Sequence, residues 1–180
     1  MRHGLTELNK LGVVNGQIDE PLAPEGIQQA HDSIILIPTS VTHIYTSSLQ
    51  RARHTGEILN SKLNHPISSH DEIGEINMGS LAGKSWEQME SGSQLKKKHR
   101  SAQFDYRIYG GESSEEVIQR VVAFLTEINQ KHSSGEALIV THGGIIRILH
   151  SLHNGEPITG EVENLSLHTF DLDKILKNSF

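Results

Sequence analysis

The sequence of 180 residues contains no cysteine. This absence excludes disulfide bonds, a cysteine-ligated zinc and a cysteine nucleophile, and it favours a reducing compartment, so we expect a cytoplasmic protein.

Aromatic residues make up only 4% of the chain, and 22 acidic residues outnumber 16 Lys and Arg. Nucleic-acid-binding domains usually combine a basic surface with aromatic platforms, so nucleic acid is not an expected partner.

Long hydrophobic runs are also missing. The longest apolar segments are residues 34–37 and 137–140, whereas a membrane-spanning helix needs about 18 or more apolar residues. No signal peptide precedes the first motif, and we expect no membrane partner.

Short apolar runs alternate with longer amphipathic stretches, and no repeat or linker divides them. We therefore interpret residues 1–180 as a single domain. This alternation predicts an α/β fold, a three-layer α/β/α sandwich with a largely parallel central sheet. Strands are expected at residues 41–46, 137–141 and 165–171, and helices at residues 24–34, 48–63 with Ser48 as the cap, 113–135 and 143–152. Residues 91–100 fit a loop or a charged helix equally well.

Two histidines lie beside glycines, His3 in Arg2-His3-Gly4 and His142 directly after the expected strand 137–141. Ligands of open α/β sheets bind beyond the carboxyl ends of the strands, so His142 lies where a site is expected. Arg51 falls in the first turn of a predicted helix, where amide groups and a guanidinium can bind an anion together. A single histidine more often has a structural role, and an isolated Arg51 fits a solvated surface equally well.

These segments resemble the histidine phosphatase superfamily, in the branch that contains cofactor-dependent phosphoglycerate mutases and their small phosphatase relatives. The resemblance runs in order along nearly the whole chain, through Arg2-His3-Gly4 with Thr6 and Asn9, Gly16-Gln17-Ile18-Asp19, Pro24-Glu25-Gly26, Ser47-Ser48-Leu49-Gln50-Arg51-Ala52, Glu75-Ile76 with Gly79 and Gly83, Gly110-Gly111-Glu112-Ser113, Arg120-Val121 and Val140-Thr141-His142-Gly143-Gly144. It implies a phosphoglycerate mutase-like fold.

The resemblance also implies a mechanism in which His3 attacks phosphorus and becomes a phosphohistidine. Two easier steps then replace one difficult step. Arg2, Arg51 and His142 would hold the phosphoryl oxygens, over which charge spreads in the transition state. Glu75 would protonate the leaving alkoxide and later activate water.

The remaining site residues are expected around this centre. The resemblance implies that Asn9 and the Gly143 amide complete the phosphate pocket. Gly16, Gln17 and Glu112 are expected to bind substrate, with Gln17 and Glu112 at the rim. For this chain we expect no metal and no cofactor, and the expected partner is a small phosphorylated metabolite.

Glu72, which also lies in the segment before Gly79, is an alternative candidate for the general acid. We prefer Glu75 because its spacing to Gly79 and Gly83 matches the family. Next to a bound phosphate a carboxyl group favours its neutral form, as a general acid at neutral pH requires.

The chain departs from the family at its start, where Met1 directly precedes Arg2. In the family an apolar strand precedes the Arg-His-Gly motif and delivers the nucleophile from the sheet. We therefore expect the sheet to lack this strand, either because the start is trimmed or mis-assigned or because the fold closes without it and leaves unpaired edges.

Several functional alternatives remain at this point. Only residues 76–110 separate Glu75 from the Gly-Glu-Ser motif. Mutases of the family resemble longer chains with an insertion here that excludes water, so the short segment favours hydrolysis over a phosphoglycerate mutase-type transfer. A metal-dependent hydrolase is suggested by the 12 histidines, but they lack ligand spacing. A non-catalytic phosphate-binding homologue is the third class.

The basic run Lys96-Lys97-Lys98-His99-Arg100 is either a solvated face or a cluster at the pocket mouth that favours substrates with additional negative charge. The sequence leaves open whether the substrate is a nucleoside-like phosphate such as α-ribazole phosphate, a sugar phosphate or a phosphorylated amino acid. It does not indicate the oligomeric state.

Overall fold

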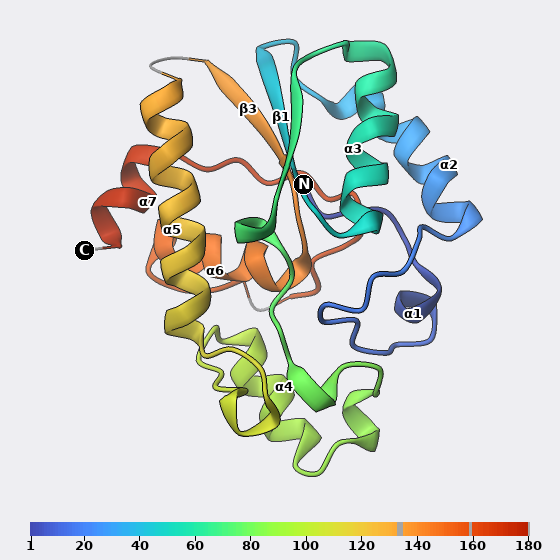
Figure 1. The fold of residues 1–180 in the computed structure, drawn as a ribbon, viewed down its shortest axis with the longest axis vertical. Helices are drawn as coiled ribbons and strands as arrows, with labels where there is room; N and C mark the ends of the chain where they lie inside the picture. The colour runs from blue at the N-terminus through green and yellow to red at the C-terminus, as the bar shows by residue number, and fades with distance from the viewer. Residues whose placement is uncertain (133–134, 159, 180) are drawn as a thin grey trace.

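A parallel three-stranded sheet forms the centre of the computed structural model, which describes residues 1–132, 135–158 and 160–179 (Figure 1). Its strands are β1 (Val41–Ser47), β2 (Ile67–His70) and β3 (Glu136–Val140), in the order β2-β1-β3. Ile44 of β1 lies opposite Ile67 on one side and Leu138 on the other. Because the strands are parallel, their carboxyl ends meet at one edge of the sheet.

Helices cover both faces of this sheet (Figure 1). The helices α2 (Pro24–Asp32) and α3 (Gln50–Leu63) pack on one face, and α5 (Ser114–Lys131), α6 (Gly143–Asn154) and α7 (Leu172–Asn178) pack on the other. Successive strand residues point to opposite faces, so Ile44 belongs to one hydrophobic cluster and Tyr45 to the other. The expected three-layer α/β arrangement is confirmed.

Short elements complete the chain. They are α1 (Glu7–Lys10), α4 (Gly92–Arg100) and the 3₁₀ helices η1 (Ser33–Leu36), η2 (Asp71–Ile73), η3 (Gly79–Leu81), η4 (Trp86–Gln88) and η5 (Arg107–Tyr109). The undecided segment 91–100 is thus helical, and it packs with η4 at the end of the molecule below the sheet (Figure 1).

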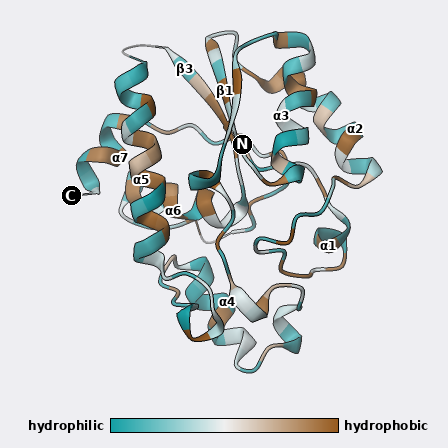
Figure 2. Ribbon diagram, in the orientation of Figure 1, coloured by the Kyte–Doolittle hydropathy of each residue, from teal (hydrophilic) through white to brown (hydrophobic). Residues whose placement is uncertain are grey.

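Along α5, hydrophobic and hydrophilic residues alternate in the pattern of a helix with one buried side (Figure 2). Among the described residues, no helix combines the length and hydrophobicity that crossing a bilayer requires.

The helix predicted to have Ser48 as its cap is capped one residue later, and it runs over Gln50–Leu63. Leu49 occupies the cap position of α3 and provides no side-chain acceptor. The Ser48 hydroxyl instead donates to the carboxylate of Asp71. The amide of Gln50 donates to Asp19 Oδ1 at 2.6 Å, so an acceptor from a distant loop replaces the local cap. Arg51 still lies in the first turn.

The strand predicted at residues 165–171 is not formed. Leu165 takes a left-handed conformation with φ +59°, and residues 165–171 join no ladder. At the other end of the chain, the residues around Arg2 contribute only an isolated parallel bridge between Arg2 and Thr141. On its other side Arg2 exchanges main-chain hydrogen bonds with Leu165 and Ser166 at 3.1 and 3.2 Å, and these are the contacts that hold the start of the segment 165–171 beside residues 1–3.

Candidate active site

A cavity of about 500 Å³ opens beyond the carboxyl ends of β1 and β3. Seven of the ten residues singled out in the sequence line it, namely Arg2, His3, Asn9, Gly16, Arg51, Glu75 and Gly143. His142 lies directly behind His3, with the two ring centroids 5.0 Å apart. Gln17 and Glu112 lie outside the cavity lining. Motifs far apart in sequence thus converge at one site.

The His3 imidazole is held with its Nε2 atom available for reaction. Its main-chain amide donates to the Thr141 carbonyl at 2.9 Å, which fixes the backbone beside β3. Nδ1 lies 2.7 Å from the Gly4 carbonyl, an acceptor that places the ring proton on Nδ1. Burial first, and then the charges of Arg2 and Arg51, hold the pKa of His3 well below its usual value of 6.5. The ring is therefore neutral, and its Nε2 lone pair faces the site and accepts from Arg51 Nε at 3.3 Å.

Arg51 is fully buried although it carries a charge. Its Nη1 and Nη2 atoms donate to the carbonyls of Ile18 and Gly16 at 2.7 and 2.8 Å, and its Nε donates to His3 Nε2 at 3.3 Å. Burial lowers the pKa of this guanidinium, while the carboxylate of Glu75 acts in the opposite direction. Gly16 thus serves the site through its carbonyl, which orients Arg51.

Three nitrogen atoms beside His3 are buried and have no hydrogen-bond partner among the described residues: Arg2 Nε, His142 Nδ1 and His142 Nε2. An unsatisfied buried polar group costs roughly 1–3 kcal/mol, so such a group calls for a functional explanation. Arg2 Nη1 donates to the Val162 carbonyl, which fixes the guanidinium while Nε remains free. Arg2 Nε and one ring nitrogen of the neutral His142 can each donate a hydrogen bond to an oxygen of an anion next to His3.

Glu75 lies at the amino-terminal end of α6. Its Oε1 accepts from the amide of Ile76 at 2.9 Å, and its Oε2 accepts from the amide of Gly144 at 3.4 Å. A Cβ atom on Gly144 would lie only 2.5 Å from Glu75 Oε1, so only glycine lets the carboxyl group approach this closely. The competitor Glu72 is exposed and does not line the cavity.

Glu112 and Gln17 act on the Glu75 segment from outside the cavity. The Glu112 carboxylate pairs with Arg120 at 2.8 Å and accepts from the Asn77 amide at 2.8 Å. Arg120 in turn donates to the carbonyls of Glu72, Gly74 and Glu75 at 2.6, 2.9 and 3.3 Å. Gln17 Nε2 donates to the Glu75 carbonyl at 3.2 Å. In this structure both residues position the segment that carries Glu75 and do not themselves line the cavity.

Several lining residues were missed by the sequence analysis. Asn164 Nδ2 donates to the His3 carbonyl at 2.9 Å and to Asn9 Oδ1 at 3.2 Å, and thereby joins the nucleophile to the pocket wall. The other missed residues with polar side chains include Trp86, Arg147, Glu161 and Glu163. They come from η4, α6 and the loop after α6, and no local motif marks them. Only the basic run pointed to this wall, through Lys96, His99 and Arg100.

The described residues contain no group of three or more His, Asp or Glu side chains that could hold a metal ion. The imidazoles of His3 and His142 are accompanied by two arginines, a combination that suits an anion better than a cation.

Comparison with known proteins is consistent with this geometry. The chain is 31% identical to the "Uncharacterized phosphatase PhoE" of Bacillus subtilis over 160 residues, which are 87% of this chain and 77% of that protein. It is 30% identical over 182 residues to the "Probable phosphoglycerate mutase GpmB" of Escherichia coli, covering 98% of this chain and 85% of that protein.

A solved structure, a mycobacterial glucosyl-3-phosphoglycerate phosphatase in complex with VO3, superposes with a TM-score of 0.79. The match covers 92% of this chain and 86% of that one at 23% identity, which shows a shared fold. The family profile of the histidine phosphatase superfamily (branch 1) matches residues 1–175. The chain therefore belongs to the histidine phosphatase superfamily.

Proposed function

We propose that the protein hydrolyses a small phosphomonoester through a phosphohistidine on His3. The observation that carries this proposal is the neutral, buried His3 ring beside three buried nitrogens of Arg2 and His142 that have no hydrogen-bond partner in the described part of the chain. A nucleophilic lone pair and the donors for a developing oxyanion charge then occupy one site.

In the first step His3 Nε2 attacks phosphorus, and the bond between phosphorus and the ester oxygen breaks. Arg2, Arg51 and His142 donate hydrogen bonds to the phosphoryl oxygens, whose charge is spread in the transition state. The leaving oxygen takes a proton from the carboxyl group of Glu75. The products of this step are the free alcohol and phosphorylated His3.

In the second step the Glu75 carboxylate accepts a proton from water while the water oxygen attacks phosphorus. The bond between phosphorus and Nε2 breaks and returns its electron pair to the ring. Inorganic phosphate leaves, and both His3 and Glu75 regain their starting protonation states. The Glu112–Arg120 pair keeps Glu75 in place through both steps.

Hydrolysis is favoured over mutase-type transfer by the short segment that covers the cavity. Residues 76–110 form only 3₁₀ turns and the nine-residue helix α4, and so short a segment supports access of water to the phosphorylated histidine. The relatives carry names of both kinds, a phosphatase and a phosphoglycerate mutase. A transfer reaction would return the phosphoryl group to the alcohol, whereas hydrolysis releases inorganic phosphate.

Turnover of a chromogenic aryl phosphate by the His3→Ala variant tests this proposal. We expect activity to fall by at least about a thousandfold, because the nucleophile is lost. The matched control His31→Ala changes an exposed histidine on α2 and should keep full activity. Incubation with a chelator should leave the rate unchanged. Loss of activity on chelation, restored by zinc, would establish a metal-dependent reaction instead.

A further inference from the structure

Three asparagine side chains link the main chain of His3 to the carboxylate of Glu20 along the wall of the active-site cavity. Asn164 Nδ2 donates to Asn9 Oδ1, and Asn9 Nδ2 donates to Asn15 Oδ1, both at 3.2 Å. Asn15 Nδ2 in turn donates to the Glu20 carboxylate. We refer to Asn164, Asn9 and Asn15 as the amide chain, and all three residues line the cavity.

The amide chain ends at an acceptor on each side. Asn164 Nδ2 also donates to the His3 carbonyl at 2.9 Å, and the other end is the Glu20 carboxylate. A carbonyl and a carboxylate accept hydrogen bonds but cannot donate them. Asn164 must therefore turn its Nδ2 atom toward His3, and Asn15 must turn its Nδ2 atom toward Glu20.

These two ends leave one orientation for the amide of Asn9. Because Asn15 turns its Nδ2 to Glu20, its Oδ1 faces Asn9 and needs a donor. On the other side Asn164 presents Nδ2, which needs an acceptor. A rotated Asn9 amide would bring two oxygens together on one side and two NH2 groups together on the other, and both hydrogen bonds would be lost.

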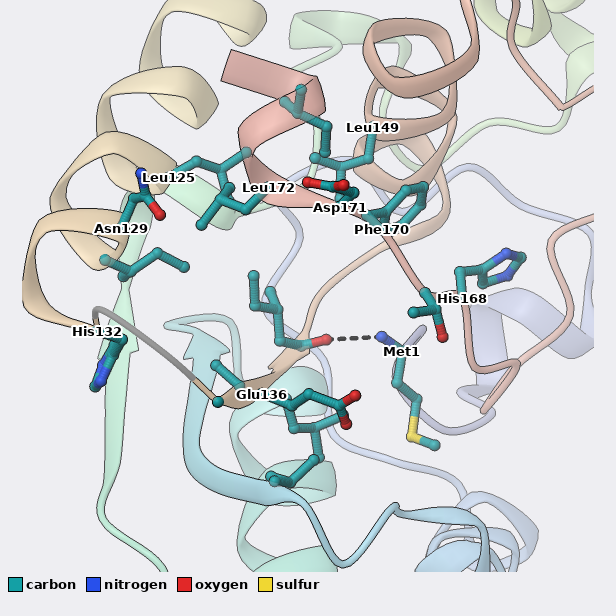
Figure 3. Close-up of a pocket in the computed structure, with 18 of the residues that line it drawn as sticks. Met1, Leu125, Asn129, His132, Glu136, Leu149, His168, Phe170, Asp171 and Leu172 are labelled. Carbon is teal, nitrogen blue, oxygen red and sulfur yellow. Dashed lines mark hydrogen bonds between the residues drawn. The ribbon is translucent and has the colours of Figure 1, made fainter. Parts of the chain in front are cut away.

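The His3 end of the amide chain is held beside β3. The His3 amide donates to the Thr141 carbonyl and the Thr141 amide donates to the Met1 carbonyl, both at 2.9 Å. A further hydrogen bond joins the Met1 nitrogen to the Ile139 carbonyl of β3 at 2.7 Å (Figure 3). The His3 carbonyl therefore has a fixed place relative to the sheet.

The Glu20 end is held by the residues around α1. Glu20 Oε2 accepts from the Leu8 amide at 3.3 Å. The Thr6 hydroxyl, which is fully buried, accepts from Asn15 Nδ2 at 3.2 Å and from the Asn9 amide at 3.3 Å. Asn15 is itself buried, so its side chain is fixed between Thr6 and Glu20.

A count of donors leaves one N–H group of the amide chain unused. Each asparagine amide carries two N–H groups. Asn164 and Asn15 each use both of theirs on the acceptors given above. Asn9 uses one for Asn15, and its second N–H has no acceptor in the part of the chain that the structure describes. Since Asn9 lines the cavity, this N–H can donate to an oxygen of a bound phosphate.

We propose that Asn164 and Glu20 are positioning residues, which act through the amide chain to turn one N–H of Asn9 toward the phosphoryl group. Asn164 also holds the His3 carbonyl, so one side chain aligns the nucleophile and a phosphate donor with each other. This role rests on the phosphoryl chemistry proposed above, but the affinity for inorganic phosphate tests it without any turnover.

A double-mutant cycle on inorganic phosphate binding, measured by calorimetry, tests the coupling between Asn164 and Asn9. Asn9→Ala should weaken binding by about tenfold, because a hydrogen bond to a charged group is lost. Asn164→Ala should weaken it by a similar factor. The combined variant should bind about as weakly as Asn9→Ala alone, because Asn164 acts through Asn9.

Asn60→Ala is the matched control for these substitutions. The Asn60 amide is also hydrogen-bonded, to the main chain of His65 at 2.8 and 2.9 Å, but it lies at the end of α3 and does not line the cavity. This variant should bind phosphate as the unchanged protein does. A loss equal to that of Asn164→Ala would show a general effect of losing a buried amide and would overturn the proposal.

The variant Glu20→Gln separates the orientation of the amide chain from the effect of charge. Burial lowers the pKa of the Arg51 guanidinium, and the carboxylates of Glu75 and Glu20 act in the opposite direction. Loss of the Glu20 charge alone would make the site more positive and strengthen phosphate binding. A glutamine amide can also donate, so it no longer fixes the orientation of Asn15. We therefore expect binding to become about threefold weaker.

The two sets of variants decide the proposal together, and Glu20→Gln decides it alone if Asn164→Ala does not fold. The proposal is wrong if the losses in Asn9→Ala and Asn164→Ala multiply in the combined variant, or if Glu20→Gln binds phosphate as tightly as the unchanged protein or more tightly. Coupled phosphate binding in a protein that does not hydrolyse phosphomonoesters would support the positioning role and contradict the proposed hydrolysis.

Discussion

The chemistry of His3 depends on its surroundings more than on its identity as a histidine. An ordinary histidine is partly protonated near neutral pH, but burial and the neighbouring arginines keep His3 neutral. The same arginines that lower its pKa can also neutralise the phosphate that it attacks. One arrangement of charges therefore serves both the nucleophile and the transition state.

The role of Glu75 as the general acid predicts a dependence on the leaving group. Replacing it in Glu75→Gln should slow hydrolysis of alkyl phosphates by roughly a hundredfold or more, because a poor leaving group needs a proton. Activated aryl phosphates should be slowed far less in their phosphorylation step. Single-turnover rates for a series of leaving groups would measure this difference.

The exposed residue Glu72 provides the control for this prediction. The Glu72→Gln variant should behave as the unchanged protein with every leaving group. Equal losses for alkyl and aryl phosphates in Glu75→Gln would show that another group supplies the proton.

At the level of single residues, the sequence predicted the site residues that belong to motifs better than the residues that hold them in position through hydrogen bonds. Arg2, His3 and Arg51 lie in contiguous motifs, and the structure brings them together. The contact of Asn164 with His3 spans 161 positions of the sequence, and no local pattern carries such information. Glu112 is in a motif, yet its position depends on Arg120, which comes from the next helix.

Among the elements, those with a strong local signal were predicted well. The predicted β1 and β3 agree with the structure to within a residue or two, and the Ser113 capping box begins α5. The strand β2 was missed because its four residues are short, polar and mostly exposed. Residues 165–171 have the composition of a strand but form no hydrogen-bonded ladder, because a ladder also needs a neighbouring strand that the local sequence does not specify. The helix α7 was also missed, although Asp171 caps it through the Lys174 amide at 3.2 Å.

Helix α4 divides the basic run of the sequence into two groups. Lys96, His99 and Arg100 are half-buried and line the active-site cavity, whereas Lys97 and Lys98 are exposed outside it. Arg100 also pairs with Glu161 across the cavity wall. Of the two alternatives that the sequence left open, the cluster at the pocket mouth applies to Lys96 and the solvated face applies to Lys97 and Lys98.

This division predicts unequal effects of two substitutions that change the charge equally. Lys96→Gln should lower kcat/KM about threefold or more for phosphomonoesters that carry additional negative charge, mainly at low salt, because electrostatic capture is screened within about 10 Å at 0.1 M salt. Lys97→Gln, the matched control, should have little effect. Steady-state rates at two salt concentrations test this, and equal effects would assign the run to ordinary surface.

For the molecule as a whole, the buried His3 and His142 and the half-buried His99 link folding to pH. Burial is the main cause that lowers the pKa of His3, His99 and His142, in the case of His99 to about 4. Between these folded values and the unfolded value of about 6.5, the unfolded chain binds more protons than the folded one. Stability should therefore be highest above neutral pH and fall as the pH drops below about 6.5.

Urea unfolding at pH 7.5, 6.5 and 5.5 would measure this effect. Each histidine contributes at most about 1.4 kcal/mol per pH unit to the slope, so the unfolding midpoint should fall clearly over this range. In His99→Gln the slope should be smaller, because one of the depressed groups is gone. An unchanged midpoint from pH 7.5 to 5.5 would mean that these histidines are protonated in the folded state.

The whole molecule combines a net charge of −6 with a concentration of arginines at one site. The central claim, that this site transfers a phosphoryl group to His3, is tested most directly by trapping the intermediate. Protein quenched in alkali during turnover should carry an acid-labile phosphate on the peptide that contains His3, and His3→Ala should carry none. Steady hydrolysis without any phosphorylated protein, or with the phosphate on another residue, would contradict the account.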